Sequence, residues 1–453
     1  MSGKNAIILD GAGAGAGDEE LAPILRILEE ELTQNGAETR TIRLRETRLA
    51  HCIGCFGCWL ETPGICREND AGREIAWSVI QSDVTVLLTP VTFGGYSSEL
   101  KKAMERWVPL ALPYFKKYYG EIHHLPRYSR NPRLVVIGVQ KEEDPESAHL
   151  FRAIAARNAL NFHAESHAAE VICSKENPEV TRWMIRSLIS RNDPVMFGPK
   201  IVAFRTEPDA QLPAAAASRN ALLIVGSPKT RSASTSAVLG GYLMDRLAER
   251  GWNTKIIKLK AGLQRESGQA ELLSAVDRSD LMIFAFPLYV DTLPFLMTKA
   301  LELIAEHRSV KGFRKPLILS AISNNGFPES YQNAPALAIC RRFAMETGMA
   351  WAGGLALGAG EALSSGVSLT GPRNGRPPVS HVIEALDLSA EALNEGSAIP
   401  EKAAALMARN PIPFLPFGAW RWIYMKGGSR SWNKQAAAFG VSKEAMLARP
   451  YAD

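Results

Sequence analysis

Short apolar runs alternate along the chain with longer segments in which apolar residues recur at helical spacing. In the first half the runs are 6–11, 39–44, 83–91, 133–140 and, less regularly, 168–173. In the second half they are 221–227, 254–260, 280–290, 315–323 and 353–358. Buried strands that alternate with helices predict a parallel sheet covered on both faces, and the pattern occurs twice.

The segment between the two halves, "EPDAQLPAAAASRN" (207–220), is rich in Pro and Ala and follows neither period, so it is typical of a linker. Two further stretches, 89–107 and 286–304, each follow the third strand with a proline, an irregular loop and an amphipathic helix. This shared order favours a duplicated domain over a coincidence between two generic strand–helix units. It places both loops at the carboxyl end of a sheet, where open α/β folds bind ligands.

The clearest candidate ligand loop is "GSPKTRSASTSAVLGGYLMDRLAERG" (226–251), which leaves a predicted strand and opens a helix. Hydroxyls, backbone N–H groups and the helix N-terminus suit a monophosphate, and Lys229 and Arg231 supply positive charge. The loop is neither G-x-x-x-x-G-K-[ST] nor G-x-G-x-x-G, which disfavours a triphosphate or a Rossmann dinucleotide. The plainer alternative is that Ser and Thr only cap a helix.

"GSPKTRSASTS" followed by "FPLYVDTLP" resembles the flavodoxin-like NADPH-dependent FMN reductases. The resemblance implies that the FMN phosphate is held by Ser227, Lys229, Arg231, Ser234, Thr235 and Ser236. It implies that the isoalloxazine ring is lined by Pro287, Leu288, Tyr289 and Val290. The third flavin-facing segment would be "SNNGFPES" (323–330), with Asn324, Asn325 and Gly326.

The first half resembles the same superfamily through "TPVTFGGYSSELKKAMER", which implies flavin contacts from Thr89, Pro90, Val91, Phe93 and Gly94. Its "CIGCFGCWLETPGIC" is similar to the cysteine loop of iron–sulfur flavoproteins and of their cluster-free relatives. We therefore expect an α/β chain of two tandem flavodoxin-like doubly wound parallel-sheet domains. Their expected order is a first domain with the cysteine-rich loop (1–195), a linker (196–219), an FMN-binding domain (220–395) and a C-terminal extension (396–453).

One departure concerns the place where the first half should carry its phosphate loop, which reads "GAGAGAGDEE" (11–20). This stretch has no hydroxyl, and Asp18, Glu19 and Glu20 stand at the expected helix start. Carboxylates there stabilise a helix but repel a bound phosphate. Thr92 also stands where the second half has Tyr289. We therefore expect the stronger FMN site in the second half.

Cysteine is concentrated in one place, since Cys52, Cys55, Cys58 and Cys66 are four of the six in the chain. Three thiols at C-x-x-C spacing, with a fourth soon after, suit a [4Fe-4S] cluster. Metal-free thiols beside a flavin are the second alternative. Zinc suits the spacing less well, because tetrahedral sites usually take two separated pairs. All three alternatives stay open at this point.

The bulk properties limit the class of protein. A net charge of +5 over 453 residues, with both signs interspersed, does not indicate nucleic-acid binding. The sequence shows no secretory leader and no apolar run of membrane-spanning length, so we expect a cytoplasmic protein without a membrane span. In a reducing compartment, clustered cysteines favour metal or redox chemistry over disulfides.

Two further segments allow more than one interpretation. The stretch 121–132 gathers His123, His124, Arg127 and Tyr128, which could bind a pyridine-nucleotide phosphate or a partner subunit, or be ordinary polar surface. The stretch 410–428 is aromatic and broken by prolines. It could cover a flavin site, touch a membrane surface or, as the default, pack as a structural arm.

These observations predict an FMN-dependent enzyme that passes electrons from NAD(P)H to a small acceptor such as a quinone, a free flavin or a metal centre. The alternative is an iron–sulfur flavoprotein that carries electrons between redox-protein partners. A third possibility is a flavin-free scaffold. A homo-oligomer is compatible with each of the three. No hydrolase motif is present in the sequence.

Overall fold

The computed structural model describes residues 4–13, 16–193, 204–213, 218–229, 233–260, 263, 265–312, 316–412 and 414–452. The chain divides into two compact units. Unit 1 comprises Met1–Val202 and Met425–Asp453, and unit 2 comprises Ala203–Tyr424. The C-terminal region is therefore shared between the two units. The domain boundaries expected from the sequence stay a prediction.

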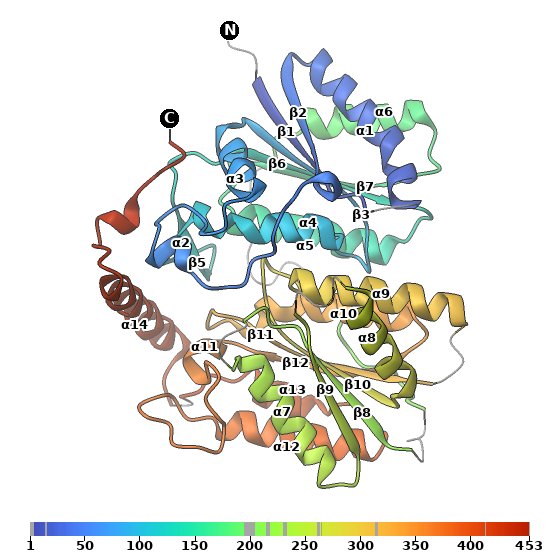
Figure 1. The fold of residues 1–453 in the computed structure, drawn as a ribbon, viewed down its shortest axis with the longest axis vertical. Coiled ribbons are helices and arrows are strands. Elements are labelled where there is room, and N and C mark those ends of the chain that lie inside the picture. Colours follow the sequence, from blue (N-terminus) through green and yellow to red (C-terminus); the bar gives the residue numbers. More distant parts are fainter. Residues whose placement is uncertain are drawn as a thin grey trace. The chain divides into compact units, whose positions relative to one another are not determined.

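Unit 1 is built on a five-stranded parallel sheet in the order β2-β1-β3-β6-β7 (Figure 1). Its strands are β1 (Lys4–Asp10), β2 (Ala37–Arg43), β3 (Val84–Pro90), β6 (Arg133–Gln140) and β7 (His167–Cys173). One face is covered by α1 (Ala16–Gln34) and α6 (Pro178–Ser190), which pack together. The other face carries α3 (Ala71–Gln81), α4 (Ser98–Met104) and α5 (Pro145–Asn161).

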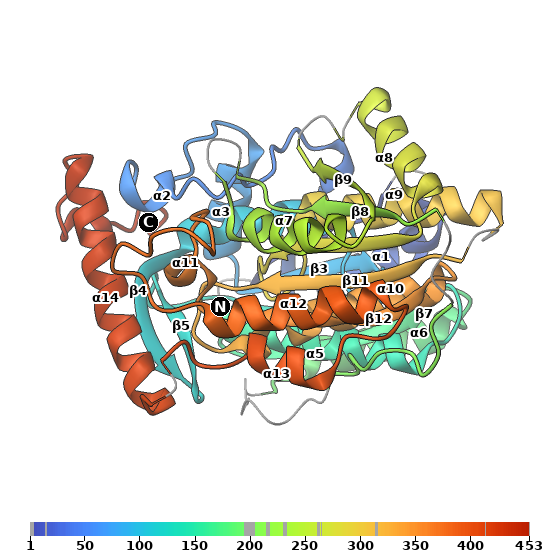
Figure 2. The same ribbon diagram turned by 90° about the horizontal axis from the view of Figure 1, so that it is seen from below.

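Unit 2 repeats this architecture with the sheet order β12-β11-β10-β8-β9. Its strands are β8 (Asn220–Val225), β9 (Asn253–Lys258), β10 (Leu281–Pro287), β11 (Ile318–Asn324) and β12 (Ala350–Leu357). On one face lie α7 (Thr235–Ala248), α12 (Ser380–Asn394) and α13 (Glu401–Met407), and Figure 2 shows α12 beside α13. On the other lie α8 (Glu266–Arg278), α9 (Phe295–Lys311) and α10 (Ala334–Glu346).

In both units the second strand in the chain is an edge strand and the third lies between the first and the fourth, which is the flavodoxin-like order. All ten strands expected from the sequence are present, so the predicted fold class is confirmed. Central strands are buried over almost their whole length, as β3 is from Thr85 to Thr89. The edge strand β9 is mostly exposed, because only one neighbour and one covered face protect it.

Two elements lie outside this repeated plan. An antiparallel hairpin, β4 (Ala111–Tyr118) and β5 (Glu121–Pro126), interrupts unit 1 before its fourth sheet strand. Its turn residues Tyr119 and Gly120 both have positive φ, 46° and 89°, as a type I′ hairpin requires. The long helix α14 (Phe417–Ala438) begins in unit 2 and continues into unit 1.

The remaining helical elements of the described residues are short, of one or two turns, and lie at loops. They are η1 (Leu44–Glu46), α2 (Gly57–Leu60), η2 (Glu105–Leu110), η4 (Ser330–Asn333), α11 (Gly360–Leu363) and η5 (Ala445–Leu447). Among the helices of the described residues, none combines the length and apolar character needed to cross a bilayer.

Candidate functional site

The loop after the third sheet strand has the same backbone in both units. In unit 1, Thr92 and Gly95 exchange two backbone hydrogen bonds of 2.9 and 2.8 Å around a two-residue turn. In unit 2, Tyr289 and Thr292 do the same at 2.9 and 3.2 Å. The structure thus places Thr92 and Tyr289 at one equivalent position. Two identical turns at matching strand ends support a duplicated domain.

The central residues of these two turns all have positive φ. Phe93 and Gly94 have φ of 53° and 78°, and Val290 and Asp291 have 48° and 58°. A β-branched residue such as Val290 rarely adopts this conformation, and such outliers concentrate at ligand-binding positions. In unit 2, residues 287–290 are all half-buried, so the predicted ring-lining segment keeps access to a ligand. In unit 1, Pro90 and Val91 are half-buried, whereas Thr89 and Phe93 are buried.

The predicted phosphate loop of unit 2 follows β8 directly. The Gly226 N–H donates to the Ala285 carbonyl at 2.8 Å, and a Cβ on Gly226 would lie 3.0 Å from that of Phe286, so a side chain is poorly tolerated. Ser234 caps α7, with its hydroxyl accepting from the Ala237 N–H at 3.1 Å. The structure places Ser227, Ser234, Thr235 and Ser236 in buried positions. Arg231 lies outside the described residues.

Asn324, at the end of β11, joins the three predicted flavin-facing segments of unit 2. Its side-chain amide donates to the Ser236 hydroxyl at 2.8 Å and to the Phe286 carbonyl at 3.0 Å. Thr235 donates to the Gly360 carbonyl at 3.1 Å, and Lys229 forms an ion pair with Glu361 at 3.5 Å. Residues predicted from separate stretches of sequence are therefore brought together at one edge of this sheet.

The residues of unit 2 fit a bound FMN. The side-chain oxygens Asn325 Oδ1 and Thr292 Oγ1 are buried without a hydrogen-bond partner among the described residues. These two oxygens are thus available to form hydrogen bonds with a polar ligand at this edge, although other buried side-chain atoms of the described residues also lack partners. A Cβ built on Gly326 would meet open space. Hydroxyls, a lysine and a helix N-terminus are suitable donors for a phosphate.

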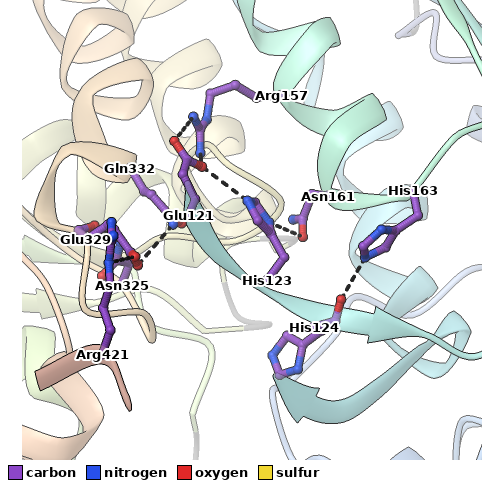
Figure 3. Close-up of polar contacts among 10 residues, drawn as sticks. All are labelled: Glu121, His123, His124, Arg157, Asn161, His163, Asn325, Glu329, Gln332 and Arg421. Atoms are coloured by element: carbon purple, nitrogen blue, oxygen red, sulfur yellow. Dashed lines mark hydrogen bonds and ion pairs between the residues drawn. The ribbon is translucent and has the colours of Figure 1, made fainter. Parts of the chain in front are cut away.

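The loop after β11 is covered by residues that were not predicted to belong to this site. The buried carboxylate of Glu329 pairs with the Arg421 guanidinium at 2.6 Å, and Gln332 contacts the same carboxylate (Figure 3). The Tyr424 hydroxyl donates to the Gly326 carbonyl, and burial raises the pKa of Tyr424. The first turns of α14 therefore pack on a predicted flavin-facing loop within unit 2.

The corresponding loop of unit 1 differs from that of unit 2 in its polar groups. The Gly11 N–H donates to the Leu88 carbonyl at 2.8 Å, and the Gly11 carbonyl accepts from Ser97 Oγ at 2.6 Å. The side chain of Asp10 is buried and accepts from the Ala12 N–H at 2.9 Å. Helix α1 begins at Ala16, so Glu19 and Glu20 lie near its N-terminus, as expected. The sequence supplies no hydroxyl to this loop.

The cysteine loop of unit 1 is fixed by aromatic packing. Trp59 is buried, and its indole N–H donates to the carbonyls of Ala111 at 2.9 Å and Val108 at 3.2 Å. Phe56 stacks on Trp59 with ring centroids 5.1 Å apart, and it precedes α2 in the left-handed region at φ 54°. The loop is thus anchored to the hairpin and to η2, which the sequence did not predict.

The four thiols of this loop differ in exposure. Cys58 is buried, Cys52 and Cys66 are half-buried, and Cys55 is exposed. Burial raises the pKa of Cys52 to about 12 and that of Cys58 well above its usual range, and the charges of the other thiols in the loop add to both shifts. The four groups are therefore within electrostatic range of one another.

The loop as it stands does not form a metal centre. Within the described part of the chain, no three His, Cys, Asp or Glu side chains converge on a point that could hold a metal ion. The Gly54 N–H approaches the sulfur of Cys52 at 3.5 Å. Ligation of a cluster by the four cysteines would require the loop to rearrange.

Two buried guanidinium groups lie near the thiols. Both terminal nitrogens of the Arg106 guanidinium donate to the Asp70 carboxylate, each at 2.8 Å. Burial alone would lower the pKa of Arg106, but the hydrogen bond to Asp70 and the charges of Cys66 and Cys52 outweigh burial and raise this pKa. Arg127 donates to the carbonyls of Met446 at 2.9 Å and Ala448 at 2.6 Å, and its charge opposes the rise in the pKa of Cys58. Sequence analysis did not connect either arginine with the cysteines.

The stretch 121–132 is buried over much of its length, although Ser129 and Arg130 are exposed. Arg157 binds Glu121 bidentately at 3.1 and 3.0 Å, and His123 contacts the same carboxylate at 3.1 Å (Figure 3). Burial alone would raise the pKa of Glu121, but hydrogen bonds from His123 and Arg157 outweigh it and lower the pKa to about 2. His123, Arg127 and Tyr128 are buried and His124 is half-buried, which argues against all three interpretations of this stretch: a nucleotide-phosphate site, a partner contact and ordinary polar surface.

Comparison with protein families gives a match over residues 22–120 to the family described as NADPH-dependent FMN reductase. The matched segment lies in unit 1 and contains the cysteine loop and the turn at Thr92. It begins after "GAGAGAGDEE", the stretch that departs from a flavin phosphate loop.

Two curated relatives are iron–sulfur flavoproteins. One from Methanocaldococcus jannaschii is 38% identical over 81 residues, which is 18% of this chain and 41% of the relative. One from Archaeoglobus fulgidus is 28% identical over 91 residues, 20% of this chain and 40% of the relative. The chain thus spans about two fifths of the length of these relatives.

Similar solved structures include an NAD(P)H:quinone oxidoreductase from Methanothermobacter marburgensis, at 12% identity and a TM-score of 0.31. That match covers 41% of this chain and 94% of the other. An azoreductase from Bacillus anthracis matches at 11% identity and a TM-score of 0.27, covering 39% of this chain and 98% of the other.

Proposed function

Because residues 22–120 match the NADPH-dependent FMN reductase family, we propose that this chain is an FMN-dependent oxidoreductase. In this proposal NAD(P)H supplies the electrons, and a quinone, a free flavin or a metal centre accepts them. The observation that carries the proposal is the equivalent turn at Thr92 and Tyr289 in the two units, one of which lies inside the family match.

FMN, when bound, accepts a hydride at N5 and releases electrons singly or in pairs. In unit 2 the proposed phosphate ligands are Ser227, Lys229, Arg231 and the α7 N-terminus with Ser234, Thr235 and Ser236. The proposed ring-lining residues are Pro287, Leu288, Tyr289 and Val290, with Asn324, Asn325 and Gly326 from the loop after β11. The partnerless oxygens of Asn325 and Thr292 support a polar ligand at this edge.

In unit 1 the proposed flavin contacts are Thr89, Pro90, Val91, Phe93 and Gly94. The structure gives this unit the equivalent turn but no hydroxyl-bearing phosphate loop. We therefore propose that unit 1 is the weaker flavin site.

The test is the visible spectrum of protein purified without oxygen, with FMN and iron quantified, followed by addition of NADPH. The proposal expects bound FMN and rapid bleaching of the flavin by NADPH alone. A colourless protein that takes up no FMN on reconstitution would exclude it and leave the flavin-free scaffold.

A second candidate is an electron carrier that uses FMN together with a [4Fe-4S] cluster on Cys52, Cys55, Cys58 and Cys66. It is favoured by the mutual electrostatic influence of these thiols and by the buried Arg106 and Arg127, whose positive charges would offset an anionic cluster. Reduction by a protein donor but not by NADPH, with iron bound, would support the carrier over the reductase.

A further inference from the structure

The C-terminal region carries an unusual distribution of charge. From residue 402 to residue 443 the sequence contains no Asp or Glu. The same stretch contains seven basic residues, namely Lys402, Arg409, Arg421, Lys426, Arg430, Lys434 and Lys443. The rest of the chain mixes the two signs, so this region stands out as a local concentration of positive charge.

One side of helix α14 is packed. In unit 2, Trp420 is buried and Arg421 pairs with Glu329. In unit 1, Trp432 packs on Trp59, and Ala436 is fully buried. A Cβ on Gly428 would lie 2.4 Å from the Phe115 ring, so only glycine allows this close approach. This side of the helix is therefore occupied.

The opposite side of α14 is mostly exposed, and Asn433 at its margin accepts a hydrogen bond from the Tyr114 hydroxyl at 2.7 Å. Trp422 is 60% exposed and Ile423 is 43% exposed. Lys426, Arg430 and Lys434 are exposed and form no ion pair within the described chain. At about 100° per residue, these five side chains fall within about a third of the helix circumference, opposite the packed side. Because they share one helix, their spacing follows from helical geometry alone.

The apolar members of this surface on the helix itself are Trp422 and Ile423. Phe414, in the turn before α14, is a further exposed ring at 89%, whereas Phe417, the first helical residue, lies on the packed side with the Arg421 guanidinium 4.5 Å from its ring centroid. Large apolar side chains gathered beside cations, with no acidic residue among them, are typical of segments that lie on a membrane surface. Aromatic rings settle at the headgroup level, while Lys and Arg reach the lipid phosphates.

We propose that the outer side of α14 (Trp422, Ile423, Lys426, Arg430 and Lys434), with Phe414 of the preceding turn, docks on an anionic phospholipid bilayer. The chain would lie on the membrane surface without crossing it, in keeping with the lack of a membrane-spanning helix among the described residues. This inference does not rest on the proposed redox function, because it uses none of the proposed cofactor-binding residues. It would bring a reductase close to acceptors dissolved in lipid.

The test is flotation of the purified protein with vesicles of phosphatidylcholine alone or with about a quarter phosphatidylglycerol. We expect binding only to the anionic vesicles, with a bound fraction that falls as salt is raised. The variant K426Q/R430Q/K434Q should bind about 100-fold more weakly, since each cation near such a surface contributes about fivefold. Trp422→Ala should weaken binding by about 10-fold.

The controls change the same residue types elsewhere. R26Q/R43Q/K258Q removes three exposed cations, and Trp183→Ala removes a 68% exposed indole on α6. Both should bind within about twofold of the unaltered protein, because neither surface contacts lipid in this proposal. An equal loss in either control would show nonspecific attraction and overturn the proposal. Failure of the unaltered protein to float with anionic vesicles would also overturn the proposal. Binding to an immobilised acidic redox protein without binding to these vesicles would assign the same surface to a protein partner, and it too would overturn the proposal.

Discussion

The indole of Trp432 meets the indole of Trp59 edge to face, with ring centroids 5.1 Å apart and planes at 85°. This contact joins α14 to the cysteine loop across more than 370 residues of sequence. Phe56 completes the cluster, at 5.2 Å from Trp432. Beyond it, Met446 and Ala436 pack on the same loop residues, Cys58 among them. The conformation of the cysteine loop thus depends on the end of the chain.

Trp432→Ala should loosen this loop. Removing a half-buried indole should lower the free energy of unfolding by about 2 kcal/mol, less than the cost at a fully buried site. Cys58 should then react faster with a thiol reagent under native conditions. Trp183→Ala is the matched control, because its indole is mostly exposed. Equal thiol reactivity in all three proteins would contradict the role given to Trp432.

Ser234→Asp should remove FMN from unit 2 while leaving α7 intact. Asp caps a helix about as well as Ser, so the bond to the Ala237 N–H is kept while a negative charge faces the phosphate. We expect the FMN content of the full chain to fall from about one per chain to near zero. Ser267→Asp, at an exposed position in the first turn of α8, should retain FMN. Retention of FMN by Ser234→Asp would refute the assignment of this loop.

Cys55→Ala separates the two roles proposed for the cysteine loop. If the four thiols ligate a cluster, the variant should lose its iron and its broad absorbance in the blue region but retain FMN. Cys173→Ala, which alters a thiol on β7 outside the loop, should lose neither. The measurement is iron and FMN per chain after anaerobic reconstitution. If unaltered protein holds no iron after this treatment, the loop is structural.

His124 should make unit 1 less stable in weak acid. Its ring lies between Trp59 and Phe115, with centroids 4.8 and 4.9 Å away, and burial lowers its pKa from 6.5 to about 4. The folded protein keeps His124 neutral, whereas the unfolded chain binds a proton there below about pH 6.5. Unfolding is therefore increasingly favoured as pH falls from the unfolded pKa toward the folded pKa. Stability should therefore decrease between about pH 6.5 and pH 4, by about 2 kcal/mol at pH 5.

His124→Phe tests this expectation because it keeps the aromatic packing and removes the titrating group. Urea unfolding at pH 7 and pH 5 should show a smaller difference for this variant than for the unaltered protein. His149→Phe, at an exposed position on α5, should leave the difference unchanged. An identical pH difference in His124→Phe and the unaltered protein would show that other groups dominate.

The amino-acid sequence by itself determined the strands and their duplication. The run 281–287 is continuously apolar and 84–90 is interrupted only by two threonines, so their burial in a parallel sheet follows from local composition. The candidate phosphate loop at Ser234 and the turn at Tyr289 were also readable, because each follows a predicted strand directly. The order of the elements then places both at one edge of the sheet.

The tertiary structure alone decided which distant groups meet. The hairpin β4–β5 was missed because its strands carry Lys and His and bury their side chains incompletely. The contacts of Arg127 with Met446 and of Trp59 with Trp432 join positions more than 300 residues apart. Periodicity records which face of an element is apolar, but it does not record which surface covers that face. That choice depends on packing among many elements, so the surroundings of the cysteine loop became visible only in the folded chain.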